Sequence, residues 1–119
     1  MNKIVELSTL KEYNNWFNLK PNNFIIIYLY SNLCDTCNNL KSKLDKLVYN
    51  NNSNIIFLKI DVENDTELVK YLDITTYPVF RIYKNYVMLE EIFGTYDNII
   101  QILESFISEK SILNLQHIT

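Results

Sequence analysis

The two cysteines of the chain, Cys34 and Cys37, lie three positions apart in the segment Cys34-Asp35-Thr36-Cys37. They directly follow an apolar run and directly precede a pattern typical of a helix. Two cysteines one helical turn apart lie on the same face, so they can close a reversible disulfide. The thiol nearer the helix start gains thiolate character from the helix N-terminus. The spacing therefore predicts a redox pair, with Cys34 as the nucleophile and Cys37 as the resolving thiol.

Two other interpretations of the pair stay open at this point. The cysteines could be buried and inert, as many structural cysteines are. They could also bind zinc, but a structural zinc site needs four ligands, and the chain adds only the lone histidine His117 to the two cysteines. We therefore expect no metal site.

Length, charge and composition narrow the class of protein. A chain of 119 residues predicts one domain, and 48% apolar residues suffice for a core. The net charge is −3 and the 11 lysines and arginines are scattered, which argues against nucleic-acid binding. No run approaches the length of a membrane span, and the first residues do not resemble a signal peptide. We expect a cytoplasmic protein, where a cysteine pair is more often catalytic or metal-binding than structural.

The apolar periodicity predicts the elements that must position the cysteines. Ser8 or Thr9 can cap the first helix, with Glu12 as the capping-box partner. The predicted elements are a strand at 3–7, a helix up to Pro21, a strand at 24–30, a helix after the cysteines, a strand at 55–62, a helix at 65–71, strands at 78–83 and 87–93, and a helix at 97–107. Residues 1–110 would form the domain, and residues 111–119 a C-terminal extension or frayed tail. This βαβαβαββα order predicts an α/β fold, a three-layer α/β/α sandwich with a mixed central sheet.

This order, together with the cysteine motif, resembles the thioredoxin fold over about residues 4 to 106. The central strand precedes the motif, and Lys59 and Asp61 lie in the next strand. Pro78 and Gly94 follow Cys34 at the separations expected of a thioredoxin of ordinary length. Tyr30-Ser31 before the cysteines has some similarity to glutaredoxins. The additional N-terminal strand and helix, and the lack of a paired glycine after the hairpin, favour thioredoxin.

The resemblance implies a substrate groove beside the cysteines. Pro78 would be the cis-proline that faces the disulfide in this fold, and the backbone of Tyr77 would pair with an extended substrate segment. Leu33 and Gly94 would complete the groove. Tyr77 is bulky for its position, so we expect it to narrow the groove.

The chain departs from the thioredoxin pattern at three places. Leu33 replaces the usual tryptophan, and Asp35-Thr36 replaces the usual Gly-Pro. The Asp35 carboxylate opposes formation of the neighbouring thiolate, by less than about 1 kcal/mol if exposed. Tyr28 replaces a buried aspartate that is thought to move protons for the second cysteine, and a buried tyrosine is a poor base near pH 7. Lys59, the usual partner of that aspartate, is kept, either as a surface lysine or as a tuning group.

These residues predict a thiol-disulfide oxidoreductase that reduces protein disulfides, more slowly than a housekeeping thioredoxin. We expect no cofactor beyond the redox-active disulfide, an upstream disulfide reductase as the electron donor, and a monomer. The alternative is a thioredoxin-like interaction module or assembly subunit with weak or no redox activity. The lost tryptophan, the lost aspartate and Tyr77 favour that alternative. An oxidase or isomerase ranks last, since nothing indicates a second active site or an oxidising compartment.

Overall fold

The fold is that of a computed structural model, which describes residues 3–51, 54–64 and 66–118, with residues 111–118 as backbone alone. The elements follow the predicted order. They are β1 (Val5–Glu6), α1 (Leu10–Leu19), β2 (Phe24–Tyr30), α2 (Asp35–Tyr49), β3 (Ile55–Asp61), α3 (Glu67–Leu72), β4 (Val79–Lys84), β5 (Val87–Ile92) and α4 (Tyr96–Ile118). The predicted α/β class and βαβαβαββα order are confirmed.

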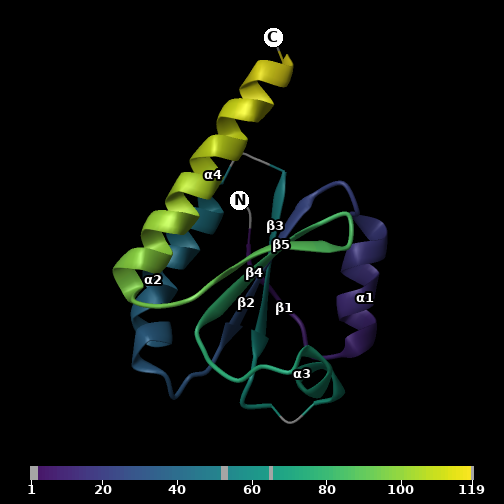
Figure 1. Ribbon diagram of the computed structural model, residues 1–119, viewed down its shortest axis with the longest axis vertical. Helices are drawn as coiled ribbons and strands as arrows, with labels where there is room; N and C mark the ends of the chain where they lie inside the picture. The colour runs from purple at the N-terminus through teal and green to yellow at the C-terminus, as the bar shows by residue number, and fades with distance from the viewer. Residues whose placement is uncertain (1–2, 52–53, 65, 119) are drawn as a thin grey trace.

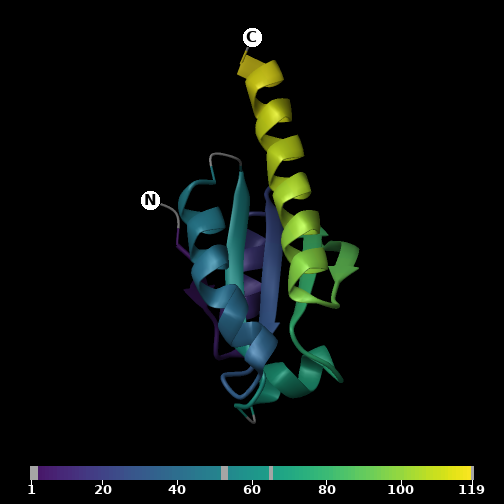
Figure 2. The ribbon, with the colours of Figure 1, turned by 90° about the vertical axis from the view of Figure 1, so that its left-hand side faces the viewer.

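The five strands form one mixed sheet in the order β1-β3-β2-β4-β5. β1 and β2 both run parallel to β3, while β4 runs antiparallel to β2 and to β5. Figure 1 shows β2 in the middle of this sheet, with α2 and α4 on one side and α1 on the other. Figure 2 shows α2 and α4 side by side across one face of the sheet. The three-layer arrangement is therefore confirmed.

β2 is central because its residues are apolar on both faces. The five residues at 25–29 are all buried. Alternate side chains of a strand point to opposite faces, so this run feeds two cores. Ile26 and Tyr28 pack with α2 and α4, whereas Ile25, Ile27 and Leu29 pack with α1 and α3. A strand buried on both faces forms a rigid base for the loop that follows it, and that loop carries the cysteines.

The first helix begins where the sequence predicts. Thr9 is its N-cap, and the Thr9 hydroxyl accepts a hydrogen bond from the Glu12 N–H at 3.1 Å. The Glu12 carboxylate in turn accepts hydrogen bonds from the N–H groups of Ser8 and Thr9. The predicted capping box is confirmed, and it fixes the chain between β1 and α1.

The last helix is longer than predicted. It was expected to end at Ile107, but its backbone continues through residues 111–118 as far as Ile118. Thr119 and the side chain of His117 lie outside the described residues. Among the helices that the structure describes, none has both the length and the apolar character needed to cross a bilayer.

Candidate active site

Cys34 is the N-cap residue of α2, in an extended backbone conformation. The Cys34 sulfur accepts a hydrogen bond from the Cys37 N–H at a distance of 3.1 Å. The Cys34 carbonyl accepts the N–H of Asn38, which begins the helical hydrogen-bond pattern. A sulfur that caps a helix N-terminus receives an N–H donor that would otherwise be unpaired, so the Cys34 sulfur takes part in the start of α2.

Cys37 lies one turn into α2 and is only 3% exposed, whereas Cys34 is partly exposed. Neither forms a disulfide, so both are free thiols. Burial, followed by the hydrogen bond with the Cys34 side chain, raises the pKa of the Cys37 thiol to about 11. Cys34 is therefore the more accessible of the two thiols, and Cys37 keeps its proton near neutral pH.

Tyr28 reaches Cys37 from the sheet. Its hydroxyl donates a hydrogen bond to the Cys37 carbonyl at 3.4 Å. Its ring is 6% exposed and stacks on Phe80, with the ring centres 4.5 Å apart, and on Tyr30 at 5.3 Å. Burial is the main cause that raises the pKa of Tyr28 above its ordinary value of 10.0. Tyr28 therefore stays protonated at neutral pH and serves as a hydrogen-bond donor.

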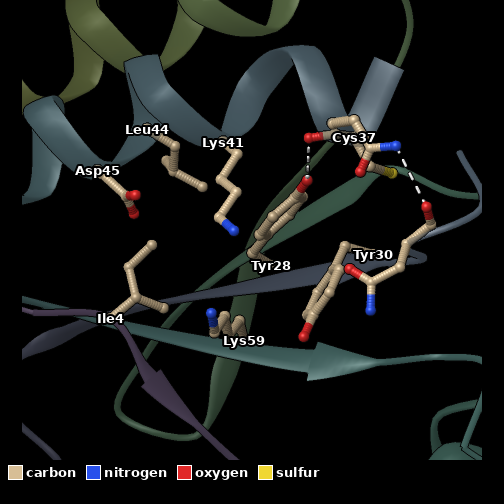
Figure 3. Close-up of a pocket in the computed structure, with 10 residues that line it drawn as sticks. Ile4, Tyr28, Tyr30, Cys37, Lys41, Leu44, Asp45 and Lys59 are labelled. Carbon is tan, nitrogen blue, oxygen red and sulfur yellow. Dashed lines mark hydrogen bonds between the residues drawn. The ribbon is translucent and has the colours of Figure 1, made fainter. Parts of the chain in front are cut away.

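A cavity of about 170 Å³ lies behind Cys37, between α2 and the sheet, and Tyr28, Cys37 and Lys59 all line it. Figure 3 shows the ammonium groups of Lys41 and Lys59 extending into this space from α2 and β3. The Lys59 ammonium also lies 3.8 Å from a carboxylate oxygen of Glu6. Lys59 is therefore partly exposed and pairs with Glu6, and its role as a surface lysine or as a tuning group stays a prediction.

The predicted groove residues lie at the end of the sheet that carries Cys34. The peptide bond between Tyr77 and Pro78 is cis, and Pro78 is buried. Pro78 directly precedes Val79, which pairs with Leu29 near the end of β2. Gly94 follows β5 with a φ of +123°, a conformation that favours glycine, and no atom would contact a Cβ added there. Asp35 is exposed in the first turn of α2.

Three large apolar side chains are exposed near this end. Leu33 is 82% exposed, Tyr77 43% and Phe93 61%. Sequence reasoning missed Phe93, because its position after β5 was predicted as the last residue of a strand. Exposed apolar side chains beside a reactive sulfur are suited to contact another protein. We call Leu33, Tyr77 and Phe93 the apolar rim.

Sequence reasoning also missed Ser31 and Glu63. Ser31 is fully buried, and its hydroxyl donates a hydrogen bond to Glu63 at 2.8 Å while it accepts one from the Leu33 N–H at 3.1 Å.

A metal site is a separate question. Among the residues that the structure describes, no group of three or more histidine, cysteine or acidic side chains is placed to hold a metal ion.

The thioredoxin family model matches residues 4–108. The chain belongs to the thioredoxin family. This thioredoxin-family chain is 33% identical to Thioredoxin 2 of Plasmodium berghei over 78 residues, which cover 66% of the chain and 49% of that protein. It is 28% identical to Thioredoxin-3, mitochondrial, of Saccharomyces cerevisiae over 91 residues, which cover 76% of the chain and 69% of that protein. The chain thus spans about half the length of the Plasmodium relative.

Solved structures agree with this assignment. The crystal structure of oxidised mitochondrial thioredoxin 3 from Saccharomyces cerevisiae matches with a TM-score of 0.72 and 26% identity, over 89% of this chain and 94% of that one. Thioredoxin NaTrxh from Nicotiana alata matches with a TM-score of 0.77 over 92% of this chain and 93% of that one, at 17% identity, which supports the fold alone. Membership of the thioredoxin family supports thiol-disulfide oxidoreductase chemistry at the level of the family.

Proposed function

We propose that this chain reduces disulfides in other proteins through a dithiol–disulfide cycle of Cys34 and Cys37. The observation that carries the proposal is the place of the Cys34 sulfur, which caps α2 and accepts the Cys37 N–H at 3.1 Å. This contact directs a helix N–H at the Cys34 sulfur and keeps Cys37 one turn away, where it can resolve the intermediate.

The cycle has two sulfur transfers. The Cys34 thiolate attacks one sulfur of the substrate disulfide, forms a mixed disulfide, and releases the other substrate sulfur as a thiolate. Cys37 then loses its proton and attacks Cys34, which closes the Cys34–Cys37 disulfide and releases the second substrate thiolate. Two electrons pass to the substrate, and the two released thiolates take up protons. An upstream disulfide reductase returns two electrons to the pair, so the cycle uses no other cofactor.

The second transfer is the slow one in this proposal. The pKa of Cys37 is raised to about 11, and Tyr28 occupies the position beneath it with a hydroxyl that holds its own proton. A side chain that remains protonated cannot accept the proton of Cys37 near pH 7. We therefore expect slower turnover than in a thioredoxin with a carboxylate at this position.

Substrates would bind across the apolar rim, with an extended segment beside Tyr77 and Pro78. The exposed rim favours protein disulfides over small charged ones, because its side chains lose water on contact. We propose that the chain acts as a monomer in the cytoplasm.

Insulin reduction with dithiothreitol tests the proposal, with the native chain compared with Cys34→Ser. Turnover that disappears in Cys34→Ser supports it. If the native chain forms the Cys34–Cys37 disulfide but reduces no protein, the interaction-module alternative is favoured instead. A Cys37→Ser variant should hold mixed disulfides with its substrates, because the second transfer cannot occur.

A further inference from the structure

Ser31 is a fully buried polar side chain directly after β2, at the base of the loop that carries the nucleophile. Its hydroxyl makes two hydrogen bonds of opposite sense. It donates to a carboxylate oxygen of Glu63 at 2.8 Å, and it accepts from the Leu33 N–H at 3.1 Å. A buried hydroxyl with both a donor and an acceptor partner has one preferred orientation.

Glu63 is itself held in place by the loop after β3. Its N–H donates to the Asp61 carboxylate at 3.0 Å. The neighbouring Val62 N–H donates to the Tyr30 carbonyl at 2.8 Å, which joins this loop to the end of β2. The Glu63 carboxylate therefore approaches Ser31 from a backbone that is fixed at two points.

The carboxylate decides which way the Ser31 hydroxyl points. The carboxylate oxygen of Glu63 is the acceptor of this hydrogen bond, so the Ser31 hydrogen is directed at Glu63. The oxygen lone pair of Ser31 is then left for the Leu33 N–H. Without Glu63, the Ser31 hydroxyl would be free to rotate. Its hydrogen could then point toward the Leu33 N–H, and the hydrogen bond from Leu33 to the Ser31 oxygen would be lost.

Leu33 and Cys34 both depend on Ser31. The Leu33 side chain is 82% exposed, yet its amide is tied to the buried Ser31 hydroxyl. The Cys34 N–H donates separately to the Ser31 carbonyl at 3.2 Å. The Ser31 hydroxyl thus positions the backbone of Leu33, while the Ser31 carbonyl positions the backbone of Cys34.

We propose that Glu63 is a positioning residue for substrate binding, which acts through Ser31 to hold Leu33 in the orientation that contacts a protein disulfide. This inference rests on the proposed function, because it assigns to the apolar rim a support that lies outside it. It separates two properties of the site. Binding of protein substrates depends on Glu63, whereas the intrinsic reactivity of Cys34 does not.

The test compares Glu63→Ala and Ser31→Ala with Glu63→Gln, whose amide oxygen can still accept the Ser31 hydrogen. Glu90→Ala is the matched control, since Glu90 is exposed on β5 and its side chain makes no hydrogen bond or ion pair among those described for residues 3–110. We expect both alanine variants to raise KM for insulin about fivefold, the factor for one ordinary hydrogen bond. Glu63→Gln should recover most of the loss, and Glu90→Ala should match the native chain.

A small disulfide reagent, 2,2′-dithiodipyridine, supplies the second arm. Its reaction with Cys34 does not need the rim, so its rate should be unchanged within about twofold in every variant. Equal losses with insulin and with the reagent would overturn the inference, and so would no loss with either. Thermal unfolding of each variant identifies a general loss of structure. If Ser31→Ala does not fold, Glu63→Ala alone still tests the inference.

Amide hydrogen exchange at Leu33 keeps this inference separate from the proposed function. Exchange at Leu33 should be faster in Glu63→Ala and Ser31→Ala than in the native chain, whether or not the chain reduces insulin. If the native chain reduces no insulin but exchange at Leu33 is faster in the two alanine variants, the proposed function is refuted while the support of Leu33 is confirmed. Unchanged exchange at Leu33 would refute the support itself.

Discussion

The hydroxyl of Tyr28 lies 3.4 Å from the main-chain carbonyl of Cys37 and donates a hydrogen bond to it. A phenol on the central strand thus contacts the backbone of the resolving cysteine. Because burial raises the pKa of Tyr28 above 10.0, the phenol remains a donor over the neutral range. The contact holds the first turn of α2 against the sheet. Because it stays protonated, the Tyr28 hydroxyl accepts no proton from Cys37.

Tyr28→Phe tests this role directly. The hydrogen bond is long, and the ring stacking on Phe80 is kept, so we expect the free energy of unfolding to fall by less than about 1 kcal/mol. The dependence of insulin turnover on pH between about 6 and 9 should not change, because Tyr28 does not titrate there. Stopped-flow rates across that range check the point, and an altered pH profile would show that the hydroxyl takes part in proton transfer.

Tyr28→Asp should have the opposite effects on stability and on rate. Loss of a buried ring leaves a cavity, which costs about 3–5 kcal/mol for an aromatic residue. The new carboxylate can accept the proton of Cys37, so the second sulfur transfer should become faster at pH 7. The measurement is single-turnover release of substrate from the Cys34 mixed disulfide, at a temperature where the variant is folded. A folded variant with no gain in rate would show that proton removal does not limit the cycle.

The raised pKa of Cys37 predicts a steep dependence on pH. Only the thiolate attacks a disulfide, and the pKa is about 11. The rate of the second sulfur transfer should therefore rise about tenfold per pH unit from neutral pH and level off near the pKa. Release of the chromophore from a Cys34–thionitrobenzoate mixed disulfide measures this step. A plateau below pH 9 would contradict the raised pKa, and Cys37→Ser should release nothing at any pH.

The capping box of α1 predicts a loss of stability in acid. Hydrogen bonds from the N–H of Ser8 and from the Thr9 side chain lower the pKa of Glu12 below its ordinary value of 4.5. A lowered pKa in the folded state adds stability above pH 4.5, and this stability is lost as the pH falls through the lower folded value. The free energy of unfolding, measured in urea at pH 7, should be larger for the native chain than for Glu12→Gln. This difference in stability should shrink by about pH 3. Glu90→Gln, without such contacts, should show no such change.

Tyr77 is expected to affect the choice of substrate. It is 43% exposed on the apolar rim, next to the cis bond at Pro78. Loss of a few tens of Å² of apolar contact corresponds to about 1 kcal/mol, or about fivefold in kcat/KM. Tyr77→Thr should change kcat/KM by up to that factor, and differently among several protein disulfides. Equal values for every protein substrate would show that Tyr77 does not contact them.

Local patterns accounted for most of the fold. The run at Phe24–Tyr30 gave the bounds of β2, because a continuous β-branched and aromatic segment ends abruptly at polar residues. Thr9 and Glu12 gave the start of α1, because a capping box needs residues only three apart. The third helix was predicted from residue 65, which lies outside the described residues, and it begins at Glu67 with Thr66 as its cap.

The predicted end of α4 was wrong because it was placed at the last residue of the apolar stripe along this helix. Ile107 is the last buried apolar residue of that stripe, and the prediction stopped there. The sequence from 108 to 118 contains no glycine or proline, which are the usual signals that end a helix. The helical backbone therefore continues past Ile107 to Ile118.

The support beneath Leu33 could not be predicted because it depends on strand pairing. Ser31 and Glu63 are 32 positions apart, and they meet because β2 and β3 run parallel with Tyr30 opposite Asp61. The available signal was a polar residue just beyond the end of each strand. That signal becomes informative only when the two strands are known to be neighbours.

The projecting part of α4 has a practical consequence for experiments on the chain. A helix of 23 residues is about 35 Å long, and its final turns extend past the sheet at the end opposite the start of α2 (Figure 1). A surface anchor or a fluorescent label joined to this end would therefore be held far from Cys34. Immobilisation through α4 should leave the reactive sulfur facing the solution, which suits single-molecule measurements of disulfide exchange.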